Sequence, residues 1–370
     1  MKDDYRTSVD EKRMLMIRSL LSDLPRSCGD FIRNITATTS TLTRLAYVYD
    51  FGIFFRYIQQ ECARLGGKEP ALYTDEDLSL LTGRDIEGYV EYLTTYYKNI
   101  QNENGEFIDS KLYTNHECGI MRKLSSLRSF FEYLFQRERI PGNIATLVPL
   151  PKLHQKPILR LEEEEAAKML RACLEGDELT ERQKSYQRIT VLRDYAILMV
   201  FLGTGIRVSE CVGLNIEDVD FEQNAFLVTR KGGNAVILYF PDEVADALKN
   251  YIAQRETIEI LPGHESALFL SLQRRRITQR AVENLVKKYA LIAAPLKKHL
   301  SPHKMRATYA TNLYQETGDI YLVADALGHS NVNTTRKHYA DMTQDRRRQA
   351  AQHVKLPDVI ADENKPESDA

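Results

Sequence analysis

The chain has 370 residues, which is enough for two domains of ordinary size. Hydrophobic residues make up 43% of it, so sizeable cores can be buried, and charged residues, at 28%, are normal for a soluble protein. No apolar run approaches the roughly 20 residues that span a bilayer, and the polar N-terminus does not resemble a secretory signal, so we expect a cytoplasmic protein.

The net charge of -2 neither supports nor excludes a nucleic-acid partner, because local basic stripes do the binding. The last fifteen residues hold five acids and one lysine and are expected to form an acidic disordered tail, 356–370. The five cysteines are widely spaced and form no CxxC pair. We therefore expect reduced, mostly buried thiols, with neither a disulfide framework nor a zinc site.

Residues 1–150 are predicted to form a mostly helical domain. Apolar residues recur at helical spacing in Thr41–Glu61, in Tyr89–Tyr97 and in Ile120–Gln136. In the third segment the apolar face carries Leu124, Leu127, Phe131 and Leu134. The opposite face is predicted to carry the polar residues Arg122, Lys123, Ser125, Ser126 and Arg128.

Four prolines between Pro141 and Pro157 predict a linker, placed at 151–158, since proline blocks both helices and sheet ladders. A second domain, 159–355, is predicted to follow. Two alternating runs joined through Gly232-Gly233 predict a β-hairpin of Ala225–Thr229 and Ala235–Phe240. Helices are predicted at 161–174, 191–203, 242–255, 278–293, 303–316 and 319–327, and from Gln344 to about Lys355. The fold class expected is mainly α with a small antiparallel sheet.

Six side chains in the second domain form a set suited to phosphodiester chemistry. Cleaving a phosphodiester requires charge neutralisation on the non-bridging oxygens, a nucleophile, and a proton for the leaving oxygen. Arginine forks grip phosphate oxygens, while histidine and lysine transfer protons. Each residue alone is a weak signal, because such residues are usually solvated charges or packing. The order and spacing of the set carry the inference: Arg207, Lys231, His303, Arg306, His329 and Tyr339.

The pair His303 and Arg306 is spaced i to i+3, so on a helix both side chains lie on one face. Pro302 fits the first turn of that helix, whose amide groups favour an anion.

These motifs resemble the tyrosine recombinase (phage integrase) family, and within it the Xer-like branch. The resemblance runs through GTGIRVSECVGLNIEDVDF, VTRKGGNAVILYFP and LSPHKMRATYATNLYQETGDIYLVADALGHSNVNTTRKHYA, which cover most of residues 160–342. Residues 40–140 resemble the helical core-binding domain of the same family less distinctively. The chain departs from many family members at Ala307, where they have a histidine, but every main catalytic position is filled.

The resemblance implies a role for each residue. Arg207 and Arg306 would clamp the scissile phosphate, and Lys231 would protonate the leaving 5′ oxygen. His303 would accept the proton of the nucleophile or hold the phosphate, and His329 would hydrogen-bond it. Tyr339 would attack to give a 3′-phosphotyrosyl link, and Glu210 would support the site. Because that link stores the phosphodiester energy and cations neutralise the charge, neither a nucleotide cofactor nor a metal ion is expected.

The implied partners are double-stranded recombination sites, bound by a homo-tetramer or by a hetero-tetramer with a related recombinase, and joined through a Holliday junction. The segment after Tyr339 would form a helix that packs on a neighbouring protomer or on its own domain. Candidate DNA contacts are Arg122, Lys123, Ser126, Arg128, Arg276 and Arg280. The alternatives are a solvated helix face for the first four, equally well supported, and a basic run that aids solubility for the last two.

Two other functions remain open at this point. A type IB topoisomerase uses similar chemistry but relaxes supercoils as a monomer without a matched site. A DNA-binding protein could keep the fold and cut nothing. The helical first domain and the Xer-like motifs disfavour the topoisomerase, and the filled catalytic positions disfavour an inactive relative. The extra N-terminal residues and the acidic tail lean toward a mobile-element or specialised recombinase, although chromosome-dimer resolution stays open.

Overall fold

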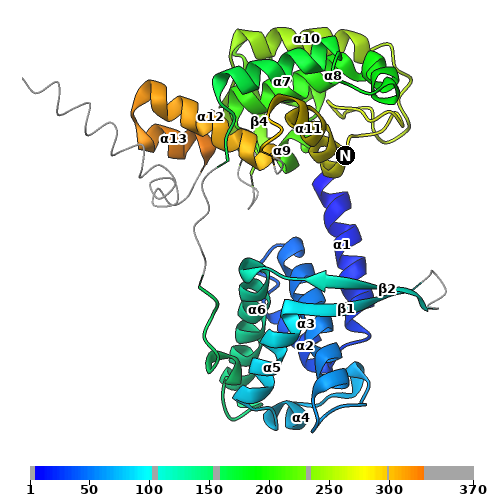
Figure 1. Cartoon of the computed structure of the whole chain (residues 1–370), viewed down its shortest axis with the longest axis vertical. Coiled ribbons are helices and arrows are strands. Elements are labelled where there is room, and N and C mark those ends of the chain that lie inside the picture. Colours follow the sequence, from blue (N-terminus) through cyan, green and yellow to red (C-terminus); the bar gives the residue numbers. More distant parts are fainter. Residues whose placement is uncertain (1–4, 102–106, 153–158, 231–234, 298–299, 329–370) are drawn as a thin grey trace, which may run out of the picture. The chain divides into compact units, whose positions relative to one another are not determined.

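The computed structural model describes residues 5–101, 107–152, 159–230, 235–297 and 300–328 (Figure 1). The chain divides into two compact units, Met1–Lys156 and Pro157–Ala370. The predicted fold class is confirmed, because helices dominate both units and the strands described form small antiparallel sheets. Within the ranges just given, no helix combines the length and apolar character needed to cross a membrane.

The N-terminal unit is built around two long helices that pack against each other, α3 (Thr41–Glu61) and α6 (Glu117–Gln136). Ser40 caps α3 by accepting a hydrogen bond from the amide of Thr43 at 3.3 Å, which fixes where this helix begins. The surrounding elements are α1 (Tyr5–Leu21), α2 (Arg26–Asn34), α4 (Asp75–Ser79), α5 (Gly83–Thr94) and the 3-10 turns η1 (Pro70–Leu72) and η2 (Ile144–Thr146).

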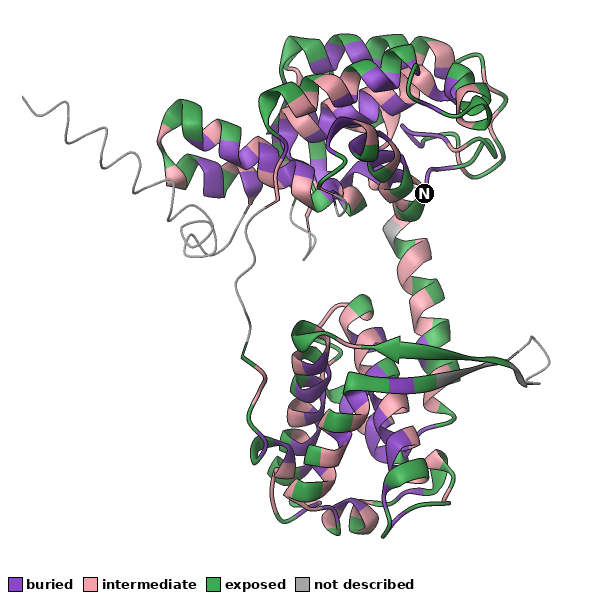
Figure 2. Ribbon diagram, viewed as in Figure 1, coloured by how far each residue is buried: buried purple, intermediate pink, exposed green. Residues whose placement is uncertain are grey.

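Aromatic side chains fill the core of this unit, which is coloured purple in Figure 2. Phe51 of α3 meets Phe130 of α6 with ring centroids 4.9 Å apart, and Phe54 meets Tyr89 of α5 at 5.1 Å, edge to face. Such ring pairs add to the apolar area buried and fix how the helices face one another. The helical periodicity of Thr41–Glu61 and Ile120–Gln136 is thereby confirmed.

The segment Tyr89–Tyr97 was predicted as one helix, and its end is wrong. Helix α5 stops at Thr94, and the chain continues as β1 (Thr95–Gln101), antiparallel to β2 (Phe107–Thr114). The β-branched and aromatic residues at the start of β1 favour a strand, and Tyr96 stacks on Tyr113 across the pair at 5.9 Å between centroids. Apolar spacing alone does not distinguish these two states over so short a run.

The central helix of the C-terminal unit, α8 (Glu181–Thr204), contacts α7 (Glu163–Glu175), α10 (Asp242–Arg255) and α12 (Pro302–Thr317). Its small sheet has the order β3-β4-β5, and β4 pairs with β5 from Ala225–Tyr239 to Thr229–Ala235, as the hairpin prediction required. The bounds are α7 (Glu163–Glu175), α9 (Val208–Gly213), η3 (Ile216–Asp218), β3 (Val219–Asp220), β4 (Ala225–Thr229), β5 (Ala235–Tyr239), α10 (Asp242–Arg255), α11 (Gln279–Ala293), α12 (Pro302–Thr317) and α13 (Ile320–Leu327).

One predicted helix of this unit begins too late. Helix α8 starts at Glu181, not at 191, because Thr180 and Gln183 form a capping box: the amide of Gln183 donates to the Thr180 hydroxyl at 3.3 Å, and the Gln183 side chain accepts from the Thr180 amide at 2.9 Å. The hydrophobic run marked only the buried half of the helix. The predicted helix from Gln344 and the acidic tail lie outside the described residues.

Candidate active site

The site begins at the sharp corner between α8 and α9. Gly205 ends α8 with φ +60°, a left-handed conformation that favours glycine. A Cβ at this position would also lie 2.4 Å from Cδ1 of Tyr309, so a side chain cannot be accommodated there. After this turn, Arg207 is the residue just before α9. Its backbone is extended and its side chain is about one third exposed.

Glu210 fixes the direction of the Arg207 side chain. One carboxylate oxygen accepts the Arg207 backbone amide at 3.0 Å, and the other accepts its Nη1 at 2.9 Å. Glu210 is buried, with 6% of its surface exposed. A buried carboxylate that holds both the backbone and the guanidinium of one arginine limits the rotamers of that arginine, so Arg207 is pre-oriented.

Arg306 reaches the same place from α12. Pro302 occupies the first turn of this helix, as predicted, and Arg306 is buried one turn later with 6% exposure. Its Nη1 donates to the carbonyl of Gly205 at 2.5 Å. The pKa of Arg306 is lowered to about 10, chiefly by burial and next by the positive charge of Arg207. The two guanidinium groups are thus close enough to repel each other, and an anion between them would relieve that repulsion.

The arginines converge on the carboxyl end of α13. Arg306 Nη2 donates to the carbonyl of Leu327, and Arg207 Nη2 approaches the next carbonyl, that of Gly328, at 3.5 Å. The terminal carbonyls of a helix lack intrahelical partners and carry partial negative charge, which attracts cations. We call Arg207, Arg306 and residues 326–328 the arginine site. In chemical terms it presents two forked cations to a single anion such as a phosphate diester.

The sequence motifs gave no role to Arg230, although the structure brings it to the arginine site. Its Nη2 donates to the carbonyl of Ala326 at 3.2 Å. The signal in the sequence that could have pointed to Arg230 was its position directly before Lys231, the predicted proton donor.

The other predicted catalytic residues are only partly described. His303 lies on α12 three residues before Arg306 and is exposed. Lys231, His329 and Tyr339 lie outside the described residues. The structure therefore brings together the two arginines and Glu210, while the catalytic roles of all seven residues stay predictions.

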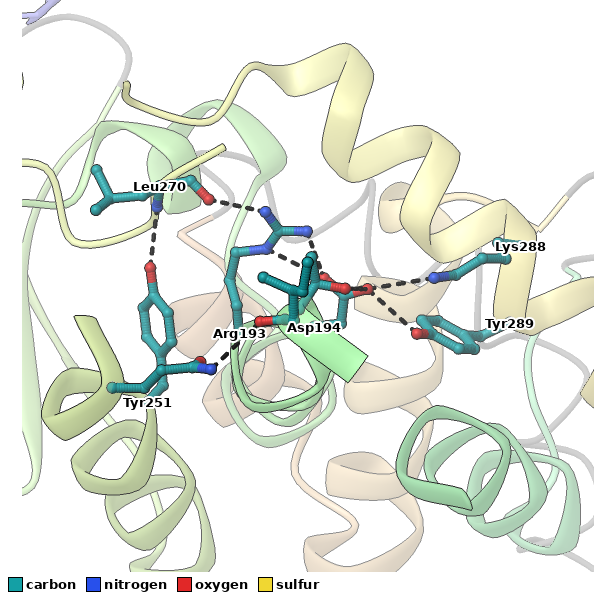
Figure 3. A network of polar contacts seen from close by, with 9 residues as sticks. Arg193, Asp194, Tyr251, Leu270, Lys288 and Tyr289 are labelled. Carbon is teal, nitrogen blue, oxygen red and sulfur yellow. Dashed lines mark hydrogen bonds and ion pairs between the residues drawn. The ribbon is translucent and has the colours of Figure 1, made fainter. Parts of the chain in front are cut away.

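A buried polar network braces the helix that carries Arg207 toward the site (Figure 3). Asp194 of α8 is 2% exposed and accepts hydrogen bonds from Arg193 Nη2 at 2.7 Å, Tyr289 Oη at 3.2 Å and Thr190 Oγ1 at 3.1 Å. Lys288 of α11 lies 3.3 Å from the same carboxylate. A charge this deeply buried requires such partners, so the network locks α8 against α11.

Three of the predicted DNA contacts are not on an exposed face, which corrects the expectation for α6 and for the segment before α11. Lys123 is buried at 6% and donates to Asn115 Oδ1 at 2.8 Å, and Ser126 is buried at 5% and donates to Asp50 Oδ2 at 2.6 Å. Arg276 is buried at 7% and donates to the carbonyl of Leu214 at 2.8 Å. Because α6 packs against α2, α3 and α5, its polar residues Lys123 and Ser126 also turn inward.

The other three candidates keep different amounts of exposed surface. Arg128 donates to the carbonyls of Ala145 and Val148 at 3.0 and 2.6 Å, so it ties α6 to η2. Arg122 binds the buried Asp50 carboxylate through both terminal nitrogens, yet half of its side chain is exposed. The Arg280 side chain is 79% exposed and pairs with a neighbouring glutamate on α11.

Comparison with known proteins identifies the family to which the chain belongs. Residues 160–346 match the model of the phage integrase family. The chain is 36% identical over 220 residues to the tyrosine recombinase XerC of Thermodesulfovibrio yellowstonii, covering 59% of this chain and 69% of that protein. It is 30% identical over 336 residues to XerC of Chlorobaculum tepidum, covering 88% of this chain and 93% of the relative.

Solved structures share the fold. The Tn1549 transposon integrase bound to circular intermediate DNA aligns with a TM-score of 0.58 at 21% identity, over 88% of this chain and 98% of that one. XerH bound to its difH substrate aligns with a TM-score of 0.56 at 20% identity, over 85% and 80% of the two chains.

The chain therefore belongs to the phage integrase family, whose members are tyrosine recombinases. Within that family it is a site-specific DNA recombinase similar to the Xer branch.

Proposed function

We propose that this recombinase cuts and rejoins DNA through Tyr339, with the arginine site holding the scissile phosphate. The observation that carries the proposal is the convergence of Arg207 and Arg306 on the adjacent carbonyls 327 and 328. Both arginines already direct donors at a weakly negative target. A phosphate oxygen carries more negative charge than a carbonyl oxygen, so the same donors would bind it more strongly.

Chain connectivity supports a place for two further residues near this site. Adjacent α-carbons are about 3.8 Å apart, so Lys231 starts one residue from Arg230 and His329 one residue from Gly328. Arg230 and Gly328 both belong to the contacts at the carboxyl end of α13. We propose that Lys231 and His329 act at this site, because each directly follows in the sequence a residue that contacts the carboxyl end of α13.

The proposed reaction balances as a transesterification. The phenol oxygen of Tyr339 attacks phosphorus, and its proton passes to His303. The bond from phosphorus to the 5′ oxygen breaks, and Lys231 protonates that oxygen while His329 hydrogen-bonds the phosphate. The products are a 3′-phosphotyrosyl link and a free 5′ hydroxyl. Reversal with the 5′ hydroxyl of another strand rejoins the DNA without a nucleotide cofactor.

Two of the similar solved structures, XerH and the Tn1549 integrase, are complexes with DNA. For this chain we propose two duplexes, four protomers and a Holliday junction, with the reaction taking place on DNA in the cytoplasm. The N-terminal unit would grip the duplex with Arg122 as a phosphate contact, and Arg280 of the C-terminal unit would be another. For the buried or backbone-bound Lys123, Ser126, Arg128 and Arg276 we propose structural roles.

The test is covalent trapping on DNA. Sheared genomic DNA from the source, nicked at random, is incubated with the full-length protein and resolved under denaturing conditions. We expect an adduct with the unmodified protein and none with Tyr339→Phe, which should still bind DNA. Sequencing the trapped fragments gives the site. Binding without any adduct would overturn the proposal, and relaxation of any supercoiled plasmid would favour a topoisomerase.

A further inference from the structure

A third guanidinium stands at the arginine site. Arg230 follows β4 directly and donates to the carbonyl of Ala326, while Arg306 and Arg207 contact the carbonyls of Leu327 and Gly328. Three consecutive carbonyls at one helix end thus each face a different arginine. The three arginines come from separate elements: the β4 end, the start of α9, and α12.

Gly328 provides the space for the Arg230 side chain. A Cβ on this glycine would lie 1.3 Å from Nη1 and 2.0 Å from Cζ of Arg230, so the guanidinium lies directly against the backbone there. Gly328 also has φ +61°, which disfavours other residues independently. The close approach holds the Arg230 charge at the point where the other two arginines meet.

The charge of Arg230 also acts on Arg306. The pKa of Arg306 is lowered first by burial, then by Arg207, and further by Arg230, while Glu210 acts in the opposite direction. The guanidinium groups of Arg207, Arg230 and Arg306 bring three positive charges to the site against the one carboxylate of Glu210. Such a pre-assembled positive field stabilises the extra charge that develops on a phosphate in the transition state.

We propose that Arg230 is a third guanidinium of the phosphate site, which speeds DNA cleavage by adding its charge, and that Gly328 is required for it to occupy that place. This inference rests on the function proposed above. It extends the set of residues that neutralise the phosphate from two arginines to three.

The first test compares charge-changing variants. On a nicked synthetic duplex carrying the mapped site, single-turnover cleavage is measured at saturating protein. Arg230→Met removes the charge but keeps much of the bulk, and we expect roughly a 100-fold slower rate with DNA affinity nearly unchanged. Arg230→Lys restores part of the rate. Gly328→Ala resembles Arg230→Met, and Arg171→Met, at an exposed position on α7, changes nothing.

The decisive test replaces the scissile phosphate with a neutral methylphosphonate. If Arg230 acts through its charge on the phosphate, the ratio of native to Arg230→Met rates falls toward one on this substrate. An unchanged ratio, or an Arg230→Lys rate no better than that of Arg230→Met, would overturn the proposal. If Arg230→Met fails to fold, Arg230→Gln, which also removes the charge, takes its place in this comparison. Failure of the native protein to cleave any substrate would instead refute the proposed function.

Discussion

At the scale of single residues, Glu210 is the support on which the site depends most. It holds the Arg207 backbone amide and guanidinium at once, from a buried position. We predict that Glu210→Gln, which keeps the size and one acceptor, slows adduct formation at saturating DNA by about 10-fold, and Glu210→Ala by about 100-fold. The rates are measured by denaturing gels over time.

The control for this prediction is Glu217→Gln, in the short turn η3 outside the arginine site. It should leave the rate unchanged. A Glu210→Ala protein that folds and cleaves DNA like the native protein would show that Arg207 does not need Glu210 to orient it.

The residues of the site were recognisable from the sequence to different degrees. Arg207, Glu210 and Arg306 lie in motifs whose order indicated phosphate chemistry, and the structure brings them together. The contact of Arg230 with α13 joins residues 96 positions apart. Nothing in local spacing encodes such a contact, since it depends on how the sheet and the helix pack.

At the scale of elements, the spacing of apolar residues identified most helices, but it did not show which neighbouring elements pack against them. Helix α6 was found from its apolar face, with Leu124, Leu127 and Leu134 all fully buried. Its polar face was misjudged because Asp50 of α3 lies against it and draws Ser126 inward. Likewise, the pair of β1 and β2 depends on a partner strand that no window around Tyr89–Tyr97 contains.

The network around Asp194 leads to a prediction about stability. Asp194→Asn removes the charge that compensates the largely buried Arg193 and Lys288 side chains. We expect the free energy of unfolding of the C-terminal unit to fall by about 3 kcal/mol. Chemical unfolding of the full-length chain measures it.

The matched control is Glu283→Gln, which breaks the exposed pair with Arg280 on α11. Its effect should stay within about 0.5 kcal/mol, because exposed ion pairs contribute little. Equal effects of the two substitutions would show that the Asp194 network does not brace α8.

At the scale of the whole molecule, the chain consists of two compact units. The N-terminal unit has its own aromatic core, and the C-terminal unit carries the arginine site and the region that matches the phage integrase family. The weak net charge of the chain is compatible with DNA binding, because local charges rather than the net charge determine such binding.

The central claim is that one phosphate, held by Arg207 and Arg306, is attacked by Tyr339. Its most direct test is to digest the trapped adduct and identify the DNA-linked peptide by mass spectrometry. We expect a 3′-phosphate joined to Tyr339 and a free 5′ hydroxyl on the other strand end. A link to another tyrosine, such as Tyr309 beside Arg306, or a link through a 5′-phosphate, would contradict it.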